Sequence, residues 1–104
     1  MDSTIIYIGS DNIIALTDLI NTTTGAPILD ATVEVTLVDS LGEEVTGETW
    51  PLAMELTSSD EYVATLSHDL DIAPHKHYVA TIVAVSGDGI TRTMKRTLVS
   101  QYDT

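Results

Sequence analysis

Three histidines with nearby carboxylates are the side chains of this chain best suited to chemistry. His75 and His77 are two positions apart, so on an extended segment both leave the same face. His68 lies just upstream, close to Asp69 and Asp71. Imidazole nitrogens and carboxylate oxygens are ligands that zinc and nickel accept. The segment has the composition of a loop, where such residues are ordinarily solvated, so these histidines are weak metal candidates and we expect no metal or cofactor.

Other arrangements of acidic residues are less specific still. Asp69, Asp71 and Asp88 could offer oxygens to calcium, but the spaced ligand loop of an EF-hand is absent. Acidic pairs such as Glu43-Glu44 occur throughout so acidic a chain. The sequence contains no Gly-x-Ser-x-Gly, no phosphate-binding Gly-Lys-Ser/Thr loop and no His-Glu-x-x-His. We therefore predict no catalytic residues and a protein that is not an enzyme.

Composition excludes several classes of partner. The 104 residues include sixteen Asp and Glu against four Lys and Arg, which gives a net charge of −12. Nucleic acids and anionic membranes would repel such a surface. The length fits a single domain, residues 1–104, and without cysteine there is no disulfide framework. Residues 5–8 are too short for a signal-peptide core, so we expect synthesis in the cytoplasm and a soluble protein.

The charge is distributed unevenly along the chain. Residues 1–75 contain fourteen acidic residues and no Lys or Arg, which gives −14, whereas residues 76–104 carry +2. The basic residues near the end include Arg92, Lys95 and Arg96. We predict that they lie beside acidic neighbours, within the fold or in an adjacent copy. The alternative is that the acidic surface only maintains solubility and the basic residues compensate locally.

Alternating apolar and polar residues indicate β-strands along nearly the whole chain. Val33, Val35 and Leu37 share one face of a segment and predict that this face packs inward. Residues 78–85 are apolar on both faces apart from Thr81, which is typical of a central strand covered on both sides. Further strands are predicted over residues 4–8, 12–20, 62–66 and 90–99.

Turn-forming residues separate these segments. Ser86-Gly87-Asp88-Gly89 is a strong hairpin signal, because Asp and Gly tolerate positive φ. About seven short strands with regular turn signals describe an all-β protein, an antiparallel β-sandwich. We expect Trp50 to close one end of its core, and residues 1–3 and 100–104 to be flexible termini.

Three segments, residues 31–42, 60–66 and 78–82, resemble in their order the immunoglobulin-like domains of tailed-bacteriophage virions. The resemblance covers residues 1–99 and implies an immunoglobulin-like β-sandwich. Small proteins of this kind decorate or cement the outside of a capsid, or lie at the head-to-tail or tail surface. An acidic protein also suits the outer surface of a virion better than its DNA-filled interior.

The resemblance implies a structural protein, present as a homo-oligomer or in many copies, that binds the major capsid protein or another virion protein. An exposed edge strand could provide the contact, so the predicted interaction residues are Ile5, Tyr7, Arg92, Lys95 and Arg96. Two alternatives remain: a bacterial surface or carbohydrate-binding immunoglobulin-like module, which would display aromatic platforms, and an accessory domain of an enzyme.

Overall fold

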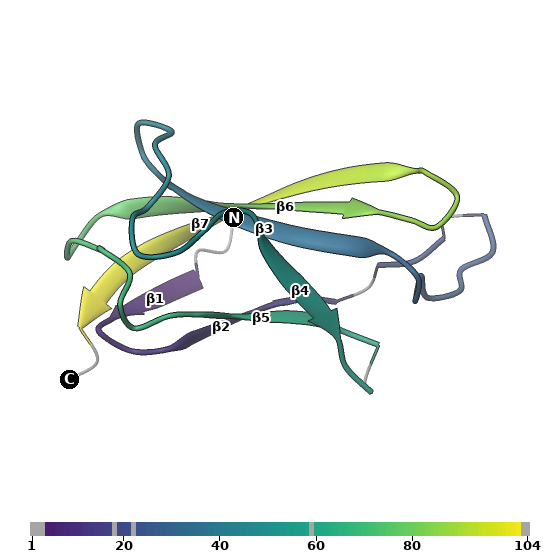
Figure 1. The fold of residues 1–104 in the computed structure, drawn as a ribbon, viewed down its shortest axis with the longest axis horizontal. Coiled ribbons are helices and arrows are strands. Elements are labelled where there is room, and N and C mark those ends of the chain that lie inside the picture. The colour runs from purple at the N-terminus through teal and green to yellow at the C-terminus, as the bar shows by residue number, and fades with distance from the viewer. Residues whose placement is uncertain (1–3, 18, 22, 59, 103–104) are drawn as a thin grey trace.

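The computed structural model describes residues 4–17, 19–21, 23–58 and 60–102, and it confirms an all-β protein. The described residues form seven strands and no helix. The strands, labelled in Figure 1, are β1 (Thr4–Ile8), β2 (Asn12–Leu16), β3 (Thr32–Asp39), β4 (Leu52–Leu56), β5 (Tyr62–Leu66), β6 (His77–Val85) and β7 (Thr91–Tyr102).

The seven strands follow the order β1-β7-β6-β3-β4-β5-β2 in one mixed sheet. The prediction of a wholly antiparallel arrangement is wrong at one edge, because β1 runs parallel to β7, with Thr4 opposite Leu98 and Ile8 opposite Tyr102. Parallel neighbours need a long connection, and the whole of the remaining sheet lies between these two strands in the sequence. The turn at residues 9–11 does not make a hairpin, since β1 pairs with β7 and β2 pairs with β5.

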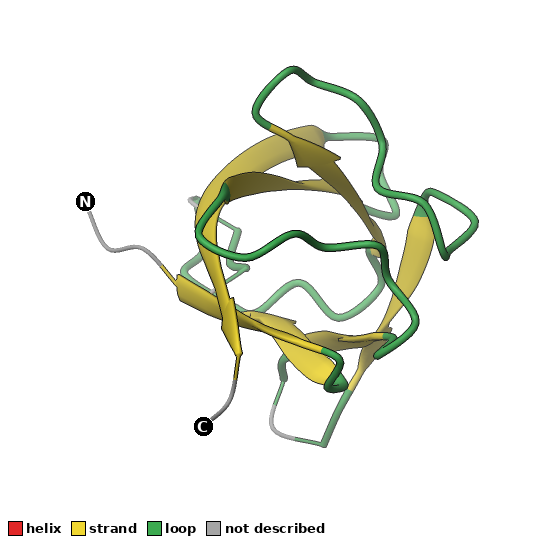
Figure 2. Ribbon diagram, turned by 90° about the vertical axis from the view of Figure 1, so that its left-hand side faces the viewer, coloured by secondary structure: helices red, strands yellow, loops and turns green. Residues whose placement is uncertain are grey.

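The sheet curls until it is nearly barrel-shaped, as the view along it in Figure 2 shows. The bend falls at β4, which divides its pairing between two partners. Residues from Leu52 to Met54 pair with β3, whereas Glu55 and Leu56 pair with β5. A strand that changes partner part-way along allows the sheet to turn a corner. The strands β1, β7, β6 and β3 and the strands β5 and β2 therefore curl around one core.

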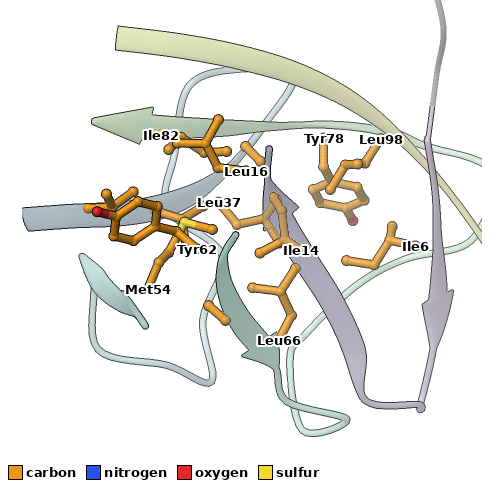
Figure 3. Close-up of a cluster of buried hydrophobic side chains, with 14 of the residues drawn as sticks. Ile6, Ile14, Leu16, Leu37, Met54, Tyr62, Leu66, Tyr78, Ile82 and Leu98 are labelled. Atoms are coloured by element: carbon orange, nitrogen blue, oxygen red, sulfur yellow. The ribbon is translucent and has the colours of Figure 1, made fainter. Parts of the chain in front are cut away.

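The side chains that alternate inward fill this core (Figure 3). Val33, Val35 and Leu37 are buried, which confirms the predicted inward face of β3. On β6, Ile82 and its inward neighbours are buried, whereas the outward residues, Thr81 among them, are only partly covered. β6 is thus central in the sheet because it has a neighbouring strand on each side. Its outer face is only partly covered, whereas the sequence predicts cover on both faces. Burying each large aliphatic side chain contributes about 1.5–3 kcal/mol.

Two ends of predicted segments differ from the structure. β2 stops at Leu16, and the described residues between it and β3 belong to no strand. β7 continues to Tyr102, so residues 100–102 belong to a strand rather than to a flexible terminus; residues 1–3 and 103–104 lie outside the described residues. The strand extends because β1 pairs with its last five residues and supplies a second ladder of hydrogen bonds.

Buried hydroxyl groups fasten the loop between β5 and β6. The Tyr78 hydroxyl accepts a hydrogen bond from the Ala73 amide at 2.9 Å. The fully buried Ser100 accepts a bond from the Lys76 amide at 3.0 Å, and its hydroxyl also donates to the Ala73 carbonyl. Trp50, half-buried against the core, donates its indole N–H to the Val45 carbonyl at 2.7 Å. Polar groups that strands leave unpaired are thus satisfied by side chains.

Candidate functional site

The outer edge of β7 is paired along only part of its length. On its other side β7 pairs with β6 from Thr91 to Val99, whereas β1 covers only Leu98 to Tyr102. Among the described residues, none pairs with the outer edge of Thr91–Lys95, which we call the open edge. This segment lies in the strand that the sequence singled out for its basic residues.

The hydrogen bonds at both ends of the β6–β7 ladder show which backbone groups point outward. The Ser86 amide donates to the Ile90 carbonyl, and the Ser100 amide donates to the Lys76 carbonyl. Positions of an antiparallel ladder alternate between bonding the partner strand and facing away from it. The register between these ends is continuous, so Thr91, Thr93 and Lys95 direct their N–H and C=O groups away from β6.

Two basic side chains stand on opposite faces of the open edge. Lys95 is exposed on the outer face, and Arg92 is half-buried on the inner face. Neither forms an ion pair or hydrogen bond with any residue that the structure describes. In a chain of net charge −12, the open edge therefore combines unpaired backbone groups with uncompensated positive charge.

Single backbone positions on the free edges of β1 and β2, in contrast, are bonded by side chains of the protein itself. The Asn12 amide group donates to the Tyr7 carbonyl and accepts from the Tyr7 N–H, both at 2.9 Å. Arg96 donates its Nη1 to the Ala15 carbonyl of β2 at 2.6 Å. These side chains take the place that the backbone of a neighbouring strand would occupy.

These contacts separate the five predicted interaction residues. Arg96 serves the fold by joining β7 to β2, and the backbone of Tyr7 is occupied. Ile5 is 42% exposed beside Ile13 of β2, which is 75% exposed, and both line a small recess between the two strands. Arg92 and Lys95 remain as the basic residues of the open edge. No sequence pattern distinguishes them from Arg96, because the distinction depends on which strand lies across the core.

A cavity of about 800 Å³ lies between described residues of the loop before β3 and the β6–β7 hairpin; the hairpin is at the right of Figure 1. Arg92 lines it, as do the half-exposed Leu29 and Ile90 at 51% and 60%. Asp30 packs so closely against Gly87 that a Cβ at that glycine would overlap its carboxylate. None of the lining residues is aromatic, so the cavity offers no stacking platform for a sugar ring.

His68 forms hydrogen bonds with Asp11, a residue that no sequence pattern associates with it. Its Nδ1 lies 2.8 Å from Asp11 Oδ1, its Nε2 lies 3.4 Å from Asp69 Oδ1, and its amide donates to Asp11. The hydrogen bond to Asp11, followed by the charge of Asp69, raises the pKa of His68, and the same hydrogen bond lowers the pKa of Asp11. A carboxylate near each ring nitrogen favours the charged form of the imidazole.

The metal candidates are not assembled into a site. His75 and His77 are both exposed, and the His75 amide donates to the Ser100 carbonyl. In the described part of the chain, no three His, Asp or Glu residues form a group that could hold a metal ion. Asp71 and Asp88 lie beyond opposite ends of β6, so they cannot share a calcium ion.

Within the described residues there is no helix long and apolar enough to cross a membrane. No protein family, curated protein or solved structure matches this chain.

Proposed function

We propose that the chain is a non-enzymatic structural protein of a phage virion that decorates or cements the outer capsid surface. The observation that carries the proposal is the open edge, an unpaired stretch of sheet with basic side chains on an acidic domain. Such an edge is suited to attachment to another protein. His68, in turn, lies between the carboxylates of Asp11 and Asp69.

Two features support an immunoglobulin-like sandwich as the finer description of the fold. The first is the change of pairing partner at β4, which divides the strands into two groups. The second is Tyr78, near the start of β6, whose hydroxyl bonds the backbone five residues upstream. This arrangement is similar to the tyrosine corner of immunoglobulin-like domains. A parallel pair at the edge, β1 with β7, is compatible with two-layer packing.

The proposal is tested on particles of a phage that encodes the chain. Mass spectrometry of purified virions should detect the protein, and antibodies against it should label the outside of intact heads in electron micrographs. Label on the tail or the head-to-tail junction would move the protein to one of those sites. A chain that is absent from the purified particles would overturn the proposal.

A further inference from the structure

We propose that the open edge (Thr91–Lys95) binds an extended acidic segment of another protein, which joins the sheet as an additional strand beside β7. The inference rests on the proposed function in one respect: it names the chemistry of the partner to which the structural protein attaches. The binding itself can be measured without a virion.

The backbone of the open edge is prepared for strand addition. Thr91, Thr93 and Lys95 present N–H and C=O groups outward, at the spacing with which a neighbouring strand forms its ladder. β1 occupies the same edge further along, so the sheet already accepts a neighbour there. Residues 1–3 lie outside the described residues.

The side chains of the open edge favour acidic residues in the added strand. Directly opposed residues of paired strands lie about 4.5–5.5 Å apart on a shared face. A carboxylate opposite Arg92 would lie on the inner face, and one opposite Lys95 on the outer face. Arg92 and Lys95 are three positions apart, so the fitting segment carries two acidic residues three positions apart, one for each face of the sheet.

A second copy of this chain brings no acidic strand to the open edge. If two β7 strands paired in antiparallel fashion about Thr93, the middle of their open edges, Arg92 of each would face Met94 of the other and Lys95 would face Thr91, so neither cation would meet a carboxylate. The other edge strands, β1 and β2, contain no Asp or Glu, and the Tyr7 backbone and the Ala15 carbonyl on their free edges are already bonded to Asn12 and Arg96. The charge of the open edge therefore favours an acidic partner over a second copy.

The binding test is an NMR titration of the ¹⁵N-labelled full chain with the capped peptide Thr-Glu-Val-Thr-Glu-Val-Thr. The matched control peptide has Lys in place of both Glu residues. We expect the acidic peptide to shift the amides of Thr91, Thr93 and Lys95, to bind about tenfold more tightly than the control, and to weaken as salt is raised. Equal binding of the two peptides, no binding at millimolar concentration, or shifts confined to β2 would overturn the inference.

Two variants separate the backbone from the charge. Thr93→Pro removes an outward N–H and leaves the hydrogen bonds to β6 intact, so it should weaken binding about tenfold, whereas Thr93→Val keeps the N–H and should bind as the natural chain does. Lys95→Glu changes only an exposed side chain and should abolish the preference, because Arg92 still favours the acidic peptide while the new carboxylate favours the lysine peptide. Unchanged peptide preference in Lys95→Glu would contradict the charge argument, even if the proline variant failed to fold.

Two further outcomes distinguish the inference from its alternatives. A dimer in analytical ultracentrifugation that Thr93→Pro abolishes would show that a second copy occupies the open edge and would overturn the acidic partner. Peptide binding at the open edge by a chain that is absent from virions would refute the proposed function alone. A virion protein whose open edge ignores the acidic peptide would refute only the inference.

Discussion

Replacing Tyr78 with phenylalanine tests how strongly the loop before β6 depends on one hydroxyl group. Tyr78 is only 4% exposed, and its hydroxyl is the acceptor for the half-buried Ala73 amide at 2.9 Å. Phenylalanine keeps the ring in the core but leaves that N–H without its partner. A partly buried donor without an acceptor costs about 1–3 kcal/mol. For a domain of this size, each kcal/mol lowers the melting temperature by about 4–8 °C.

The assay is urea denaturation followed by fluorescence of the single tryptophan, Trp50, which is half-buried and reports loss of the core. The matched control is Tyr102→Phe, which removes the same atom from a residue that is 58% exposed and forms no hydrogen bond with the described residues. We expect the control to change the unfolding free energy by less than about 0.5 kcal/mol. If both variants changed it equally, the hydrogen bond would not be what stabilises the loop.

Three further predictions concern other contacts. Because the pKa of His68 is raised, the stability that its pair with Asp11 contributes is complete below the ordinary histidine value of 6.5 and is lost as the pH rises through the folded-state pKa of His68. Because the pKa of Asp11 is lowered, the same contribution is also lost at acidic pH, as the pH falls from 3.8 through the folded-state pKa of Asp11. The difference in melting temperature between the natural chain and His68→Gln should therefore be largest between pH 3.8 and 6.5. Gly47→Ala should destabilise more than Gly42→Ala in thermal melts, because both glycines have positive φ but only Gly47 would bring its Cβ to 2.7 Å from a backbone carbonyl. Arg96→Met should lower the unfolding free energy by about 1.5–3 kcal/mol, since the β2 carbonyl loses a charged donor, and an unchanged denaturation midpoint would refute the contribution of that bond.

Much of the secondary structure follows from the sequence, because alternation with a period of two is a local property. β5 has the predicted bounds, and the inward face of β3 is as expected. The alternation pattern does not predict β4, because Leu52–Leu56 is apolar at four of five positions. The strand also changes its pairing partner from β3 to β5 part-way along. The parallel pairing of β1 with β7 was also not predictable, because no local pattern records which distant strand lies alongside.

The three basic residues of β7 are evident from the sequence, but their different surroundings are not. Three basic residues in one strand marked β7, yet Arg96 points across the core to β2 while Lys95 points outward. Alternation predicts that neighbouring residues face opposite ways, but it does not indicate what lies on each side. The bond between His68 and Asp11 joins residues 57 positions apart, so no spacing rule could have found it.

The pairing of β1 with β7 has a consequence for how the chain is made. Thr4 leaves the ribosome 94 residues before its partner Leu98, which is about 5–20 s at ordinary rates of synthesis. Throughout that interval the apolar residues of β1 have no strand to pair with, and a strand in this condition is prone to aggregate. A nascent or truncated chain without the end of β7 would therefore display β1, and cellular proteases and chaperones could recognise it as unfinished.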